Sequence, residues 1–324
     1  MNRNPNAPRH AADMVGGMAR RILSPNSTGI ILEGYSRAIY LCSAEGELVW
    51  LSSADVPMHR RGLRVPVPLP KPQSGSTYRV DRSILLLGSA ASIDLDEACV
   101  WEPRRLVRSS GSFAVPVSGS DQLRMLPSPK GFGALLASTL EYASGTPFPA
   151  RAPGRDRVLI SAYPSICGVA RACQRADLGS LLHHSADLVG LGEGLTPSGD
   201  DYVGGVLFGL AMLQEAGTPL TWCSSEVLTS FIQASQARTN RISAALLGDH
   251  ATGHAAETLH RFAVAFLMGL PGQAAYRAAD DLIQMGHSTG WDLLTGAWTA
   301  MALVPRWAPP TRRQADALAT AVTT

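Results

Sequence analysis

The residues best suited to chemistry lie in one short stretch, residues 190–205, with the sequence GLGEGLTPSGDDYVGG. Its first three glycines alternate with other residues, which permits positive φ and lets a ligand approach the backbone closely. Unpaired N–H groups at a following helix start, together with two hydroxyl groups, would form an anion pocket. The expected donors to a phosphate, carboxylate or carbamoyl group are Gly192, Gly194, Thr196, Ser198 and Gly199.

The same pattern occurs a second time at residues 286–296, GHSTGWDLLTG. After one gap, Gly199 aligns with Gly290 and Asp201 aligns with Asp292. Hydroxyl residues precede the glycine in both copies, and an acid follows in the first helical turn. We expect two helix starts that face one another around a single site. Chance similarity between two helix-start sequences is the alternative.

Further polar residues could complete this site. Thr239, Asn240 and Ser243 have near-helical spacing, and Ser288 and Thr289 belong to the second copy. A surface helix with polar side chains would explain the first group equally well.

Three titratable residues are candidates for catalytic roles. Asp200 and Asp201 could orient a ligand amide, although acids in a first helical turn also suit the helix dipole. His287 could bind an anion or act as a general acid–base, but a loop histidine can also be merely exposed or capping.

Common cofactor and nucleophile motifs are not matched. A Walker loop needs Gly-Lys-Ser/Thr, but the two lysines, Lys71 and Lys130, lie elsewhere. The glycine spacing is one residue short of a dinucleotide fingerprint, and no G-x-S-x-G elbow surrounds Ser198. The acids Asp200, Asp201 and Asp292 could hold a hard cation, and His250 and His254 could form a metal pair. We predict neither a metal nor a cofactor.

The second half of the chain has helical periodicity. A helix is expected over 200–215 with Ser198 as its N-cap, and others over 259–267 and 273–285. A further helix follows residue 130 and stops at Gly145, before a Pro- and Arg-rich loop at 146–157. Glycine inside a helix is costly, so Gly204, Gly205 and Gly209 predict close packing against another backbone.

The first half has β texture. Short runs rich in strand formers, such as residues 34–42 and 46–53, follow one another from 28 to 103 with Pro and Gly between them. We therefore predict an α+β protein, with an N-terminal β-rich small barrel or sandwich followed by a mainly α-helical domain. The expected boundaries are a flexible leader at 1–27, a β-rich domain at 28–127, a helical domain at 128–305 and a C-terminal tail at 306–324.

Composition excludes several classes of protein. The 324 residues are 45% hydrophobic and 17% charged with a formal net charge of +2, which argues against binding to nucleic acid. The five cysteines are scattered without a C-x-x-C pair, which favours a reducing cytoplasm. No apolar run reaches the ~18 residues of a membrane span, and the amino terminus lacks the apolar segment of a secretory signal.

Three of these motifs together resemble a bacterial protein family. The stretch 190–205, RTNRIS at 238–243 and GHSTGWDLLTG at 286–296 are similar to the AllH-type subunit of oxamate carbamoyltransferase from allantoin degradation, a purine-catabolic route. GYSRAIYL at 34–41 adds to the likeness, which covers roughly residues 28–305. Glu193 stands where a small residue or proline is expected, which places an acid beside the proposed anion site.

The resemblance implies a reversible carbamoyl transfer, in which oxalurate and phosphate give oxamate and carbamoyl phosphate. It also implies an FdrA-like subunit and a second partner subunit. Two other readings remain open: a non-catalytic assembly partner whose glycine-rich helices pack against another subunit, and a small-carboxylate-binding protein.

Overall fold

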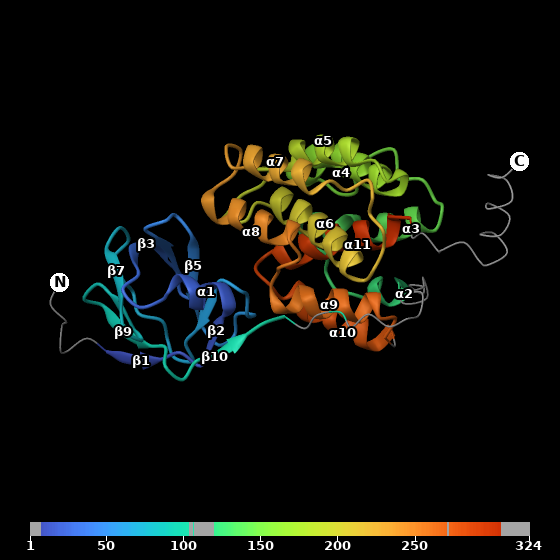
Figure 1. Ribbon diagram of the computed structural model, residues 1–324. Helices are drawn as coiled ribbons and strands as arrows, with labels where there is room; N and C mark the ends of the chain where they lie inside the picture. The colour runs from blue at the N-terminus through green and yellow to red at the C-terminus, as the bar shows by residue number, and fades with distance from the viewer. Residues whose placement is uncertain (1–7, 104–105, 107–119, 271, 306–324) are drawn as a thin grey trace, which may run out of the picture. The chain divides into compact units, whose positions relative to one another are not determined.

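The computed structural model describes residues 8–103, 106, 120–270 and 272–305 (Figure 1). The chain divides into two compact units, one comprising Met1–Arg105 with His254–Phe262 and the other Leu106–Gly253 with Ala263–Thr324. The first unit contains the strands and the second contains most of the helices, which confirms the predicted α+β class.

The described strands of the first unit form one curled ten-stranded sheet, in the order β1-β9-β8-β7-β3-β4-β5-β6-β2-β10. Most neighbours pair antiparallel, whereas β1–β9, β2–β10 and β5–β6 pair parallel. The strands are β1 (Arg9–Ala11), β2 (Met14–Gly16), β3 (Thr28–Gly34), β4 (Ala38–Ser43), β5 (Leu48–Ser52), β6 (Gly62–Arg64), β7 (Thr77–Asp81), β8 (Ile84–Leu87), β9 (Ala91–Asp94) and β10 (Cys99–Trp101).

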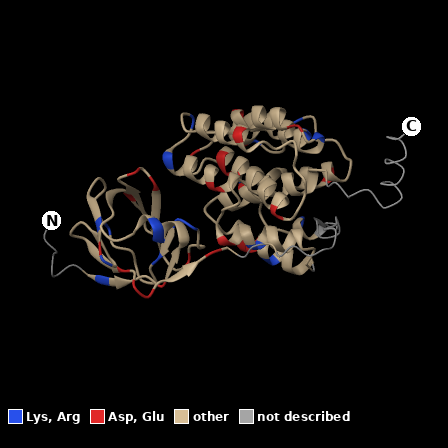
Figure 2. Cartoon of the chain, in the orientation of Figure 1, with Lys and Arg blue, Asp and Glu red and all other residues tan. Residues whose placement is uncertain are grey.

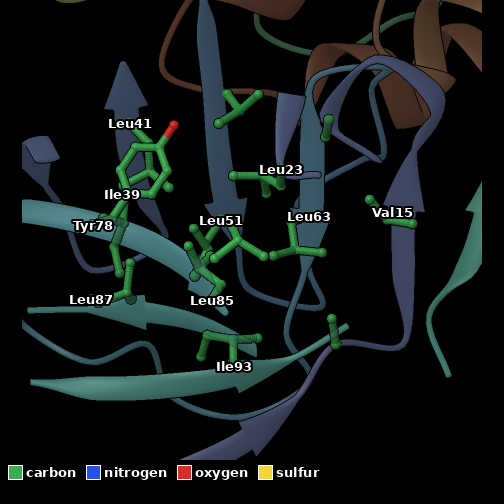
Figure 3. Packing of buried hydrophobic residues seen from close by; sticks show 14 of the residues in the cluster. Val15, Leu23, Ile39, Leu41, Leu51, Leu63, Tyr78, Leu85, Leu87 and Ile93 are labelled. Carbon is green, nitrogen blue, oxygen red and sulfur yellow. The ribbon is translucent and has the colours of Figure 1, made fainter. Parts of the chain in front are cut away.

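The concave side of the sheet holds an apolar core (Figure 3). Side chains from distant strands, such as Ile39, Leu63 and Ile93, are fully buried there. Helix α1 (Gly17–Ile22) contributes Ala19 and Ile22 to the same core. Burial of these apolar side chains therefore explains why the sheet curls around a core.

Part of the segment predicted as a flexible leader is ordered. Residues 9–22 form β1, β2 and α1, and β1 and β2 pair within the sheet. Burial of Ala12, Val15 and Leu23 in the core explains this difference, because the Asn-, Pro- and Arg-rich composition of the segment conceals its few apolar anchors. Residues 1–7 of the leader and the predicted tail at 306–324 lie outside the described residues.

The second unit is built from helices. After α2 (Ser120–Leu123) and the 3₁₀ turn η2 (Gly131–Leu135), the described helices are α3 (Leu136–Ala143), α4 (Arg157–Arg175), α5 (Leu178–Leu188), α6 (Ser198–Glu215), α7 (Ser225–Ser235), α8 (Arg241–Ala251), α9 (Glu257–Leu267), α10 (Gly272–Ile283) and α11 (Thr289–Leu303). α9 crosses the division between the units at Phe262. The helices expected over 200–215, 259–267 and 273–285 correspond to α6, α9 and α10.

Helices α6 and α11 form the centre of this unit, and most of their residues are buried. A Cβ atom added to Gly205 would lie 2.3 Å from the Leu293 carbonyl oxygen, and one added to Gly296 would lie 2.0 Å from that of Tyr202. Each helix therefore lets the backbone of the other approach it at a glycine. The early residues of one helix face the early residues of the other, so the two helices run parallel.

The other two glycines of α6 also have neighbours within the chain. A Cβ at Gly209 would lie 2.8 Å from Ala300 Cβ, and one at Gly204 would lie 2.4 Å from His250 Nδ1. The predicted close packing of a second backbone is confirmed for Gly205 and also for Gly209, where a Cβ would lie 2.9 Å from the Ala297 carbonyl oxygen. At all three glycines the partner lies inside this chain.

Charged residues of both signs are interspersed over the two units (Figure 2). Across the described residues, no helix combines the length and the apolar character needed to cross a bilayer.

Candidate functional site

The two copies of the glycine turn start the two central helices. Gly199 donates its N–H to the Leu191 carbonyl, and Gly290 donates its N–H to the Met285 carbonyl, at 2.9 and 3.0 Å. A Cβ at either glycine would lie 1.9 Å from a carbonyl oxygen at the end of the preceding helix, Leu188 for the first and Leu282 for the second. The starts of α6 and α11 thus share the close approach of a glycine to the end of the preceding helix.

The structure brings these two helix starts together through paired hydroxyl groups. Thr196 Oγ1 lies 3.1 Å from Thr289 Oγ1, and Ser198 Oγ lies 3.3 Å from Ser288 Oγ. Because α6 and α11 run parallel, the positive ends of both helix dipoles meet at this point. The arrangement concentrates hydroxyl groups and positive potential in one place.

Two buried carboxyl groups lie at the same helix starts. Asp201 and Asp292 are only 4% and 0% exposed, and both lie in the first turn of their helix. Asp292 Oδ1 accepts a hydrogen bond of 2.6 Å from the Phe132 N–H. Asp201 Oδ2 and Asp292 Oδ2 have no hydrogen-bond partner within the described residues. Each carboxyl therefore keeps one buried oxygen that no described residue satisfies with a hydrogen bond.

Burial changes the acidity of this pair. It raises the pKa of Asp201 well above its usual value, and the neighbouring Asp292 charge raises it further. Burial also raises the pKa of Asp292 to about 7, against the lowering effect of the Phe132 N–H. Nearby hydroxyls act in the lowering direction too, those of Thr196 and Thr289 on Asp201 and those of Ser198 and Ser288 on Asp292. A protonated carboxyl here can donate a hydrogen bond as well as accept one.

Asp200 has a different environment from Asp201. Its Oδ1 accepts a 2.7 Å hydrogen bond from the Gly190 N–H. Its Oδ2 accepts from the hydroxyl of Thr239 and, at 2.6 Å, from that of Ser243. Three donors on two segments therefore converge on one buried carboxylate, which ties the glycine turn to the start of α8.

Asn240 strengthens this connection. Its side-chain oxygen caps α8 by accepting from the N–H groups of Ile242 and Ser243, both at 3.0 Å. Its Nδ2 donates to the Leu195 carbonyl at 2.8 Å. RTNRIS is thus the start of a helix, and its polar residues hold the glycine turn in place.

The turn itself uses the freedom of glycine. Gly190, Gly192 and Gly194 all have positive φ, at 82°, 121° and 94°. A Cβ at Gly192 would lie 2.8 Å from the backbone N of Ser198, whereas one at Gly194 would meet nothing within 4 Å. The turn is therefore closed against the helix start at Gly192 and open at Gly194.

Several expected details differ in the structure. Pro197, not Ser198, occupies the N-cap position of α6, and no side chain caps it. The Ser198 hydroxyl pairs with Ser288 across the two helix starts, which explains why it does not cap its own helix. His287 and Glu193 are exposed.

Sequence reasoning missed the contribution of η2. Gly131 has φ of 52°, and a Cβ there would lie 2.4 Å from Asp292 Oδ1. The backbone at Gly131 and the hydrogen bond from the Phe132 N–H therefore cover one side of the Asp292 carboxyl. The only available signal was the pair of glycines in GFG at 131–133, and it does not identify a partner 160 residues away.

Asp200, considered above as a cation ligand with Asp201 and Asp292, uses both of its oxygens for hydrogen bonds with Gly190, Thr239 and Ser243. Within the described part of the chain, the group of three or more ligating side chains close enough for one metal ion is His183, His184 and Asp187. His250, of the other histidine pair considered, is buried against Gly204.

Comparison with known proteins agrees with the motifs. No solved structure was found to match the chain. Residues 188–301 match the family model described as oxamate carbamoyltransferase subunit AllH. The match begins at the last residue of α5, ends within α11, and so contains both helix starts and the beginning of α8. The region that carries the Asp201–Asp292 pair thus matches the AllH model, in agreement with the resemblance of the sequence motifs.

Proposed function

We propose that this chain is a subunit of a cytoplasmic carbamoyltransferase that interconverts oxalurate plus phosphate with oxamate plus carbamoyl phosphate. The observation that carries the proposal is the meeting of two parallel helix starts around the buried Asp201–Asp292 pair, inside the segment that matches the AllH model. All four small molecules in this reaction are anions, and two converging helix starts favour anions.

The reaction needs little covalent participation by the protein. A phosphate oxygen attacks the carbamoyl carbon of oxalurate, the bond from that carbon to the oxamate nitrogen breaks, and the nitrogen takes a proton. Hydrogen phosphate loses one proton as it forms carbamoyl phosphate, so the transfer is balanced. The protein must hold the two anions in line and move that proton.

The site residues have complementary roles in this scheme. Protonated Asp201 gives its proton to the departing oxamate nitrogen and recovers one from the attacking phosphate, while Asp292 holds the carbamoyl NH₂. The anions are bound by backbone and hydroxyl groups at the two helix starts, namely Gly192, Gly194, Thr196, Ser198, Gly199, Ser288 and Thr289. His287, exposed on the second turn, binds an incoming anion.

Asp200 is a positioning residue in this proposal. Because it binds Gly190, Thr239 and Ser243, it fixes the turn that supplies the anion donors. Asn240 supports the same turn through the Leu195 carbonyl. No metal or cofactor takes part in the scheme.

The test is reconstitution. This chain is purified with an FdrA-like subunit and the second partner, and carbamoyl phosphate formation from oxalurate and phosphate is measured. Ser198→Ala and Asp201→Asn complexes should assemble normally and lose about 100-fold or more of the activity. Full activity in both assembled variants would overturn the assignment.

Two results would favour the other readings. An assembly partner without a catalytic role would be required for complex formation and insensitive to Asp201→Asn. The reason for that reading was the set of glycines inside α6, and these pack against residues of this chain. A small-carboxylate-binding protein would bind oxamate or oxalurate in calorimetry of the isolated chain and give no turnover in any complex.

A further inference from the structure

A second group of ligating side chains lies on α5, outside the segment that matches the AllH model. His183, His184 and Asp187 each offer one ligand atom, and these atoms all lie within 4.8 Å of one another. His183 and Asp187 are four residues apart and share a face of the helix. The two imidazole rings meet edge to face with centroids 5.3 Å apart.

Neighbouring residues of α4 position two of these side chains. The Ser165 hydroxyl donates a 3.1 Å hydrogen bond to Asp187 Oδ2. A Cβ at Gly168 would lie 2.4 Å from the His184 ring, so the absence of a side chain there leaves room for the imidazole. Hydrogen bonding of a carboxylate by a second residue is the usual way in which metal ligands are oriented.

We propose that His183, His184 and Asp187 bind one late first-row divalent metal ion, with Zn²⁺ as the reference ion. Two imidazole nitrogens and a carboxylate oxygen suit such ions, and Zn²⁺ accepts three protein ligands with water in the fourth position. Magnesium and calcium prefer all-oxygen sites and bind here more weakly. The site is separate from the Asp201–Asp292 pair and does not depend on the carbamoyl-transfer proposal.

The experiment is a Zn²⁺ titration of the full chain by calorimetry. Because Cys99 is an exposed thiol that could bind zinc, all proteins carry Cys99→Ser. The parent should bind one Zn²⁺. Titration with Mg²⁺ should give little heat.

Variants assign the site. His183→Ala and Asp187→Asn change exposed side chains and should each weaken Zn²⁺ binding by about tenfold or more, with Ser165→Ala producing a smaller loss. His10→Ala, in β1, is the matched control and should bind as the parent does. Co²⁺ should give a visible spectrum typical of nitrogen and oxygen ligands without a thiolate band.

Three outcomes would overturn the proposal: no Zn²⁺ binding by the parent, unchanged affinity in both His183→Ala and Asp187→Asn, or an equal loss in His10→Ala. Far-UV circular dichroism of each variant establishes that a loss of binding is not a loss of fold.

Discussion

The hydroxyl of Thr196 lies 3.1 Å from that of Thr289, although the two residues are 93 positions apart in the chain. This contact joins the two copies of the glycine turn at the starts of α6 and α11. It also places both hydroxyls beside the buried Asp201 carboxyl, whose pKa they act to lower. Substitution of Thr196 or Thr289 therefore tests whether these hydroxyl groups contribute to catalysis.

Removal of the Thr196 hydroxyl should impair catalysis in the reconstituted complex. Thr196→Val keeps the side-chain shape but removes a donor from the site, and should lower kcat by about tenfold or more. Thr196→Ser keeps the hydroxyl and should retain most of the activity. Steady-state assays of assembled complexes make the comparison, and equal activity of the two variants would argue against a role for this hydroxyl.

The Asp292 carboxyl should make stability depend on pH. Its folded-state pKa of about 7 lies above the ordinary value of 3.8, so the folded state binds the proton more tightly. Its contribution to stability is complete below about pH 4 and falls as pH rises to about 7.

Asp292→Asn keeps an acceptor for the Phe132 N–H and cannot ionise. Relative to the parent, this variant should therefore gain stability between pH 4 and 7, by up to about 4 kcal/mol. Urea denaturation at a series of pH values measures this gain. A constant difference between the two proteins across that range would contradict the assignment.

Gly205→Ala should destabilise the second unit. The added Cβ would lie 2.3 Å from the Leu293 carbonyl oxygen, which belongs to the backbone of α11 and cannot turn away. We expect the free energy of unfolding to fall by about 1–3 kcal/mol. Gly248→Ala in α8 is the matched control, because its Cβ would meet only Ile232, at 3.7 Å. That variant should gain about 0.5–1 kcal/mol from helix propensity; equal effects in both would disprove the packing argument.

Asp200 and Ser243 should be energetically coupled. In Asp200→Asn an NH₂ group, which donates, replaces one of the two oxygens that accept hydrogen bonds from Gly190 and Ser243. Ser243→Ala removes one of these hydrogen-bond donors. In a double-mutant cycle, the two changes should show a coupling energy of about 0.5–3 kcal/mol. Ser230→Ala on the exposed side of α7 supplies the control and should be additive with Asp200→Asn.

The sequence predicted the elements whose signals are local. The glycine-rich turn, the helix that follows it and the stop at Gly145 depend on residues within a few positions of one another. The relation between Gly199 and Gly290 was visible because the two copies share a spacing. The β texture indicated a sheet-forming unit, but three-residue strands such as β1 and β6 are too short for alternation to reveal them.

Other features depend on contacts between distant residues and carried no local signal. Asp200 and Asp201 are adjacent and chemically identical, yet one is saturated with donors and the other faces Asp292. Only the direction of each side chain from the helix decides this difference. The approach of Phe132 to Asp292 likewise depends on how η2 packs against α11, which no spacing within either segment determines.

The reciprocal glycine contacts between α6 and α11 have a consequence for how the site operates. Since Gly205 receives the backbone of α11 and Gly296 receives that of α6, neither helix can slide or rotate past the other without a steric clash. The separation of Asp201 and Asp292 is accordingly set when the chain folds. Substrate binding therefore need not supply the free energy for assembling this pair, and ligands of different size find open space at Gly194, where a Cβ would meet nothing within 4 Å.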